Sequence, residues 1–247
     1  MAQNEYAVRL EHVTKTFGPV VANKDVSLGV RRGEILALLG ENGSGKTTLM
    51  NMLSGIYFPD EGQIYIDGQP VTIASPKDAF ALGIGMIHQH FKLVDVFSAA
   101  DNVWLGRENR SYGFRERYKA EVSGKKGIGK FGAAASVIFH AAGFFVSERL
   151  MKKSRYREIE EISRSFGFEM DPKKKVYHMA VSEKQTLEIV KVLYYGAKVI
   201  ILDEPTAVLT VQETEKLFGV LRQMRAEGHS IIIITHKPVS YTHLRAH

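Results

Sequence analysis

Residues 40–47 read Gly-Glu-Asn-Gly-Ser-Gly-Lys-Thr and match the pattern Gly-x-x-x-x-Gly-Lys-Ser/Thr at every fixed position. The apolar run at residues 34–39 predicts a strand buried on both faces, and residues 47–57 have the apolar spacing of a helix. Glycines between such elements let backbone N–H groups cradle phosphate oxygens, and the helix N-terminus adds positive charge. We therefore predict a nucleotide-binding loop formed by Gly40, Glu41, Asn42, Gly43, Ser44, Gly45, Lys46, Thr47 and Thr48.

Two side chains of this loop carry further expectations. We expect Lys46 to reach the β- and γ-phosphates of a nucleotide and the hydroxyl of Thr47 to bind Mg²⁺. The alternative is a chance glycine-rich turn. The strand and helix expected on either side of the loop favour the phosphate-binding interpretation.

A second motif, residues 199–205, reads Val-Ile-Ile-Leu-Asp-Glu-Pro. Its apolar run predicts a core strand, and ligands of open α/β sheets bind at the edge where such strands end. We expect Asp203 to hold Mg²⁺ through water and Glu204 to polarise the attacking water as a general base. Two carboxylates after a strand are a weak signal alone, because carboxylates often cap the next helix, but beside a phosphate-binding loop they are a strong one.

The remaining pattern predicts an α/β fold. Alternating apolar residues indicate half-buried strands at residues 6–13 and 26–30, and a turn at residues 67–68 separates two further strands. The β-branched run at residues 230–235 predicts another core strand of a parallel sheet. The other expected elements are a short helix, a strand at 84–88 and a loop within residues 76–104, and helices at 157–166, 182–195 and 212–227.

In this order the motifs resemble the nucleotide-binding subunit of an ATP-binding cassette (ABC) transporter, over roughly residues 6–108 and 147–237. The resemblance implies a P-loop NTPase core with a parallel sheet, an N-terminal antiparallel β-subdomain and an inserted helical subdomain at residues 88–182. It also implies that the domain, residues 1–237, is incomplete at its C-terminal end. Residues 238–247 are then expected to be a non-native tail, with a short natural tail as the alternative.

Three more positions match the family's motifs. Gln89 matches the glutamine that touches Mg²⁺ and the attacking water and couples to the membrane subunit, and His236 matches the histidine that contacts the γ-phosphate. Phe17 stands where the family places an aromatic ring that stacks on adenine. A lone Phe is more often a core residue and a lone His more often structural, so these assignments rest on the resemblance.

The family's Leu-Ser-Gly-Gly-Gln signature is replaced here, where Met179 is followed by Ala180, Val181, Ser182 and Glu183. In the family this segment contacts the γ-phosphate of ATP held by the partner cassette. Ala180 has no hydroxyl and Ser182 replaces a glycine, so we expect a weaker contact, by about 1–2 kcal/mol for the lost hydrogen bond. The segment at residues 207–210 also departs from the family, which usually has an acidic end there.

Residues 86–94 and 204–210 resemble the nucleoside and simple-sugar importers, in which two cassettes are fused in tandem. The resemblance implies the first of two cassettes, which binds and hydrolyses ATP with Mg²⁺ and energises import of a nucleoside or simple sugar. The implied partners are membrane permease subunits, a second cassette and, indirectly, a solute-binding protein, with no nucleic acid. The implied location is peripheral, on the cytoplasmic face of the cell membrane. The alternatives are a soluble ABC-type ATPase acting on ribosomes or DNA, and an ATP-binding module that does not hydrolyse.

Composition and charge limit the remaining possibilities. The 247 residues are 45% hydrophobic and 24% charged, which excludes a disordered chain, and the lack of Cys excludes disulfides, Cys-based zinc sites and thiol catalysis. The N-terminus shows no secretory signal.

The net charge of +6 is unevenly distributed: residues 110–157 hold 12 Lys and Arg against 3 Asp and Glu, so this block carries +9 and the rest of the chain −3. The block overlaps an expected insertion at about residues 109–142. The interpretations left open are a solvated loop, a contact with the permease or anionic lipid, and a nucleic-acid contact. Lys130, His140 and several glycines make the apolar stretch at residues 127–146 a poor transmembrane helix.

Overall fold

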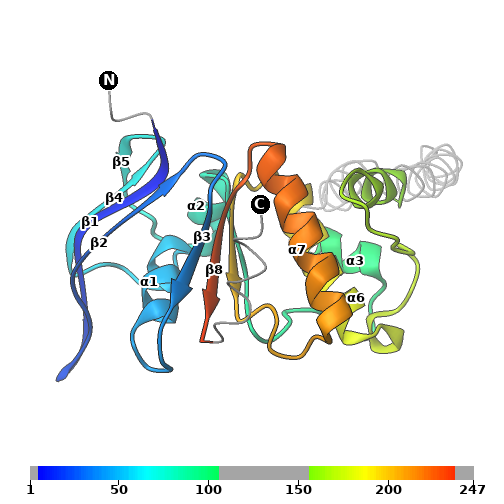
Figure 1. Cartoon of the computed structure of the whole chain (residues 1–247), viewed down its shortest axis with the longest axis horizontal. Helices are drawn as coiled ribbons and strands as arrows, with labels where there is room; N and C mark the ends of the chain where they lie inside the picture. Colours follow the sequence, from blue (N-terminus) through cyan, green and yellow to red (C-terminus); the bar gives the residue numbers. More distant parts are fainter. Residues whose placement is uncertain (1–4, 106–155, 237–247) are drawn as a thin grey trace, which may run out of the picture.

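Two four-stranded sheets form the framework of the computed structural model, which describes residues 5–105 and 156–236 (Figure 1). The first sheet is antiparallel, with the order β2-β1-β4-β5. Its long hairpin pairs β1 with β2, and a shorter hairpin pairs β4 with β5 through the predicted turn. The strands are β1 (Tyr6–Phe17), β2 (Val20–Arg31), β4 (Glu61–Ile66) and β5 (Gln69–Val71).

The second sheet is parallel, with the order β3-β8-β7-β6. Alternate residues of its strands enter two different cores: Ile201 and Ile232 pack against α1 and the first sheet, whereas Ile200 and Ile231 pack against α7. Because both faces are covered, the strands are the continuous apolar runs expected of a parallel sheet. They are β3 (Ile35–Leu39), β6 (Ile84–Ile87), β7 (Val199–Asp203) and β8 (Ser230–Thr235).

Helices lie on both faces of the parallel sheet. In Figure 1, α1 lies between the two sheets, and α7 covers the opposite face of β8, with α3 and α6 farther out. Phe218 and Leu221 of α7 are fully buried against that face. The helices are α1 (Lys46–Leu53), α2 (Pro76–Ala81), α3 (Ala99–Trp104), a helical segment at residues 156–165, the 3₁₀ turn η2 (Val176–His178), α6 (Val181–Tyr194) and α7 (Val211–Ala226).

One short helix was not expected. We predicted a loop at the end of residues 76–104, but α3 forms there. Ser98 and Asp101 cap it reciprocally: the Ser98 side chain accepts from the backbone N–H of Asp101, and the Asp101 side chain accepts from the backbone N–H of Ser98. The buried side chains of α3 join a third core with α6 and the helical segment at residues 156–165. Six residues are too few for a helical period to show in the sequence.

The predicted α/β fold, with a parallel core and an N-terminal antiparallel sheet, is confirmed. The helical subdomain at residues 88–182 stays a prediction, and its insertion at 109–142 and the tail at 238–247 lie outside the described residues. In the part of the chain that the structure describes, no helix is both long and apolar enough to span a bilayer. The parallel strands all end at one edge, and β3, β6, β7 and β8 bring the predicted site residues to it.

Candidate functional site

The loop between β3 and α1 forms a concave turn around its own lysine. Gly43 and Gly45 have φ values of 85° and 83°, in the left-handed region where a side chain would be strained. The ammonium of Lys46 donates hydrogen bonds to the carbonyl oxygens of Gly40 and Glu41, each at 2.7 Å, and to the hydroxyl of Ser44 at 3.2 Å. A positive charge and the N-terminus of α1 therefore meet inside the loop, which suits a phosphate group.

Asp203, the last residue of β7, lies against the start of α1. Asp203 is buried, and the hydroxyl of Thr47 lies close enough to its carboxylate to influence its pKa. Burial raises the pKa of Asp203 above its usual value, and the negative charge of Glu204 raises it further, whereas the Thr47 hydroxyl lowers it. The carboxylate and the hydroxyl are thus neighbours at the mouth of the loop.

Glu204 follows β7 in an unusual backbone conformation. Its φ is 51°, and its N–H donates to the carbonyl of Ile234 on β8 at 2.9 Å. Oε1 of its side chain lies 2.7 Å from Nδ1 of His236, whereas the buried Oε2 has no hydrogen-bond partner among the described residues. A free buried carboxylate oxygen is a suitable acceptor for the proton of an attacking water.

A cavity of about 390 Å³ joins these groups. Gln89, which follows β6, lines it, so side chains after all four parallel strands meet there. This arrangement is the crevice at the carboxyl ends of strands where α/β proteins bind ligands. The lining residues are Val20, Val21, Ala22, residues 42–48, Gln89, Asp203, Glu204, Ile234 and His236.

The oxygen donors of this cavity fit Mg²⁺. The hydroxyl of Thr47, the amide of Gln89 and the carboxylate of Asp203 are hard ligands of the type that Mg²⁺ binds beside nucleotide phosphates. Within residues 5–105 and 156–236, no three His, Asp or Glu side chains cluster as a metal site.

Phe17 is not among the lining residues. It ends β1 at the tip of the first hairpin, 41% exposed, and its ring meets that of Tyr57 edge-on at 5.0 Å. Val20 and Val21, across the hairpin turn, do line the cavity. Adenine stacking on Phe17 stays a prediction.

The four signature residues lie away from this cavity. Ala180 is the N-cap of α6 without a side-chain cap, and its backbone N–H donates to the carboxylate of Glu183 at 2.8 Å. Lys174 pairs with that carboxylate at 2.7 Å, and this ion pair holds the pKa of Glu183 below its usual value. None of the residues 180–183 lines the cavity of the phosphate-binding loop, and their contact with a partner's phosphate stays a prediction.

The structure adds a link that the sequence analysis did not identify. The carboxylate of Glu213 in α7 accepts hydrogen bonds from the N–H and hydroxyl of Thr210, and these bonds, together with the nearby Ser182 side chain, hold the pKa of Glu213 below its usual value. The start of α6 thus lies close to the start of α7. The Thr210-x-x-Glu213 spacing is a capping box and could have been read from the sequence, but its contact with Ser182 could not.

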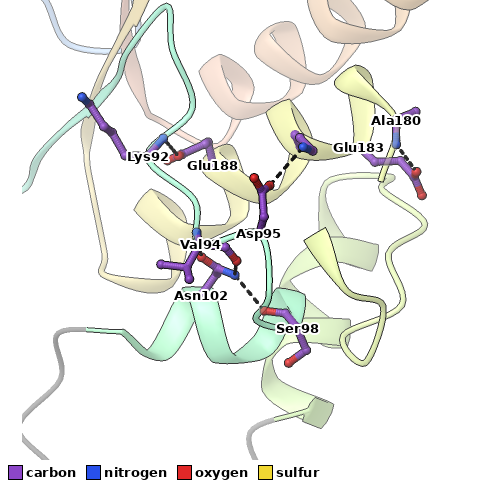
Figure 2. A network of polar contacts seen from close by, with 9 residues as sticks. Lys92, Val94, Asp95, Ser98, Asn102, Ala180, Glu183 and Glu188 are labelled. Carbon is purple, nitrogen blue, oxygen red and sulfur yellow. Dashed lines mark hydrogen bonds and ion pairs between the residues drawn. The ribbon is translucent and has the colours of Figure 1, made fainter. Parts of the chain in front are cut away.

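The segment after Gln89 is also anchored by polar side chains that the sequence analysis missed (Figure 2). Buried Asn102 accepts from the N–H of Val94 at 2.7 Å and donates to the carbonyls of Val94 and Ser98 at 3.1 and 3.0 Å. Glu188 of α6 accepts from the N–H of Lys92 at 2.7 Å. Figure 2 shows this segment running between α3 and α6, so side chains of both helices hold the backbone that follows Gln89.

Comparison with known proteins agrees with this geometry. Residues 23–207 match the family described as ABC transporter. The chain is 41% identical over 234 residues to the nucleoside import ATP-binding protein NupA of Lactococcus lactis subsp. cremoris, covering 95% of this chain and 39% of that protein. It is 40% identical over 228 residues to the guanosine import ATP-binding protein NupO of Bacillus subtilis, covering 92% and 38%.

A further relative and a solved structure are also similar to this chain. The ribose import ATP-binding protein RbsA 1 of Streptomyces avermitilis is 37% identical over 96% of this chain and 38% of its own length. The chain thus spans about two fifths of the length of these relatives. A nucleotide-free ATP-binding cassette from an ABC transporter has the same fold, with a TM-score of 0.72 at 21% identity over 96% of this chain and 84% of its own.

Proposed function

The chain belongs to the ABC transporter family, and on that premise we propose that it binds and hydrolyses ATP to energise solute import through a membrane permease. The observation that carries the proposal is the meeting of the phosphate-binding loop with Gln89, Asp203, Glu204 and His236 around one cavity. Each of these groups has a task in transferring a phosphoryl group to water.

The proposed reaction uses side chains already in place. Backbone N–H groups of the loop and Lys46 hold the phosphates and stabilise the charge that develops on them. Oε2 of Glu204 accepts a proton from a water molecule while the oxygen of that water attacks the γ-phosphorus of ATP. The bond between the γ-phosphorus and the bridging oxygen of ADP breaks in the same step. His236 fixes the orientation of Glu204 through Oε1. Mg²⁺, held by Thr47, Gln89 and Asp203, would neutralise phosphate charge.

The proposed partners include a second cassette, either fused in tandem or in a dimer. The signature residues 180–183 would contact the ATP of that cassette, which is consistent with their absence from the lining of this chain's cavity. The proposed solute is a nucleoside or simple sugar, supported by the identity to import proteins for nucleosides, guanosine and ribose. The proposed location is the cytoplasmic face of the membrane, bound to permease subunits and supplied by a solute-binding protein.

One observation favours a second candidate, an ATP-binding module that does not hydrolyse. Ala180 brings no hydroxyl to the partner's phosphate, and Glu183 already occupies the N–H of Ala180. The intact pair of Glu204 and His236 favours hydrolysis over this alternative.

ATP turnover in the complete membrane complex distinguishes the two candidates. Phosphate release by the wild type, reduced roughly 100- to 10,000-fold in Glu204→Gln with ATP binding retained, is the expected result because the general base is lost. Turnover that is undiminished in Glu204→Gln would exclude the proposed base, and a complex that binds ATP without turnover would establish the second candidate. Co-fractionation with ribosomes or DNA in place of a permease would contradict the importer assignment.

A further inference from the structure

Asn23 of β2 is a buried amide that directly supports the phosphate-binding loop. Its side chain is 7% exposed, and its Nδ2 donates to the carbonyl of Gly45 at 3.3 Å. Its Oδ1 is buried without a hydrogen-bond partner among the described residues. An unpaired buried acceptor lowers stability, and an apolar side chain of similar size would avoid that cost. Stability alone therefore does not account for an amide at this position.

The carbonyl that Asn23 contacts belongs to the N-cap of α1. Gly45 has no side chain with which to cap the helix, and its carbonyl already accepts the first helical hydrogen bond from the N–H of Leu49 at 2.9 Å. The amide of Asn23 supplies the second hydrogen bond to the same oxygen. The strand and the loop are in close contact here, because a Cβ on Gly45 would lie 2.3 Å from the carbonyl oxygen of Ala22.

The orientation of this carbonyl determines where the next N–H points. The peptide bond is planar and trans, so the carbonyl of residue 45 and the N–H of residue 46 point in opposite directions. Anchoring the carbonyl of Gly45 to β2 therefore aims the N–H of Lys46 away from β2, out of the N-terminus of α1. The N–H groups at this end of a helix are those that bind phosphate.

We propose that Asn23 is a positioning residue of the phosphate-binding loop: its amide anchors the N-cap of α1 and fixes the N–H of Lys46 toward the nucleotide phosphates. This inference rests on the proposed ATP-binding function. Asn23 does not line the cavity, so it acts through the loop and not on the ligand.

The test compares Asn23→Leu with the wild-type chain by calorimetric titration with ATP–Mg²⁺ and with inorganic tripolyphosphate. Loss of one orienting hydrogen bond is expected to weaken both ligands by the same factor, roughly three- to tenfold. The melting temperature is expected not to fall, because the substitution also removes the unpaired Oδ1. A residue that merely stabilised the fold would give the opposite combination, a lower melting temperature with unchanged affinity.

Asn51 provides a matched control, since its Oδ1 is also buried without a partner in the described parts of the chain, yet it lies in the second turn of α1. Asn51→Leu is expected to leave ATP affinity unchanged. Should Asn23→Leu not fold, Asn23→Ala is measured by the same criteria.

The possible outcomes separate this inference from the proposed function. Equal ATP affinity in the wild type and the Asn23 variant overturns the positioning role alone. An equal loss of ATP affinity in the Asn51→Leu control also overturns the positioning role, because the effect would then be a general destabilisation of α1. A folded wild-type chain that binds neither ATP nor tripolyphosphate overturns the proposed function, and the inference with it.

Discussion

Glu204 combines backbone strain with an unpaired buried oxygen. A non-glycine residue at a φ of 51° is uncommon and costs of order 1–3 kcal/mol, so it persists only where the surroundings impose it. Here the N–H of Glu204 is held by Ile234, and Oε1 by His236. The strain thus accompanies a carboxylate whose second oxygen faces no protein partner among the described residues, as expected of a group reserved for a substrate.

Lys46 is the side chain whose removal should affect nucleotide binding most. Charge-assisted hydrogen bonds contribute about 1.5–3 kcal/mol each, so Lys46→Ala is expected to weaken ATP binding by roughly 10- to 100-fold or more. Titration calorimetry on the chain measures the loss. Lys77→Ala, which removes an exposed lysine of α2, is the control and should bind ATP as the wild type does.

The buried carboxyl of Asp203 predicts a pH-dependent cost to stability. Because its pKa is raised on folding, the ionised carboxylate destabilises the folded protein. This penalty is absent at a pH below the unfolded-state pKa, near 3.8, and is complete at a pH above the folded-state pKa. Asp203→Asn, which keeps an acceptor for Thr47, is therefore expected to raise the melting temperature at pH 7. The gain should shrink as the pH falls toward 4, and the variant should lose its Mg²⁺-dependent ATP affinity.

Asp60 is a control because its pKa is shifted in the opposite direction from that of Asp203. Lys15 and Thr16 hold the pKa of Asp60 down to about 2, from 3.8. The stabilisation by this group is present above pH 3.8 and disappears as the pH falls through 2, so Asp60→Asn should lower the melting temperature at pH 7 and not near pH 2. A lower melting temperature for Asp203→Asn at pH 7 would refute the assigned cost of burial.

At the scale of helices and strands, Asn102 is the main polar anchor of the segment that carries Gln89. It makes three hydrogen bonds to the backbone of residues 94 and 98 and is fully buried. Asn102→Ala would leave buried backbone groups unpaired, so we expect it to lower the free energy of unfolding by about 2–4 kcal/mol. Urea denaturation measures this, and a loss below about 0.5 kcal/mol would show that water replaces the anchor.

Local patterns in the sequence were sufficient to predict most of the elements that position the site. The core strands at residues 199–203 and 230–235 are continuous apolar runs, and the loop at residues 40–47 has its glycines and lysine within eight residues. Because parallel strands end at a common edge, the grouping of Asp203 with the loop also followed from the pattern, whereas the assignment of His236 rested on the family resemblance.

The remaining features depend on contacts between distant residues. Asn23 meets Gly45 only because β2 passes beside the loop, and Ser182 meets Glu213 only because α6 and α7 begin side by side. The first hairpin also extends to residues 17 and 20, beyond the predicted strands, through backbone pairing of residues that have no apolar alternation. Such features leave no periodic signal in the sequence.

At the scale of the whole molecule, the positive net charge does not come from the part of the chain that forms the site. The chain carries +6, but the part outside residues 110–157 carries −3, and its cavity offers an anion one lysine and backbone N–H groups. The excess positive charge therefore belongs to residues 110–157 and not to the residues that line the cavity. Docking to a permease or an anionic membrane stays one of the interpretations of this block. The signature residues lie outside the same cavity, which is the arrangement expected if a complete site needs a second cassette.

Uptake by the complete importer in membrane vesicles tests the central claim most directly. Labelled nucleosides and simple sugars are offered with ATP, and the wild type is compared with Glu204→Gln. The account predicts that ATP drives uptake of one of these solutes and that the variant, while still binding ATP, loses it together with turnover. Uptake that continues undiminished in the variant, or a folded complex that hydrolyses ATP without moving any of these solutes, would contradict it.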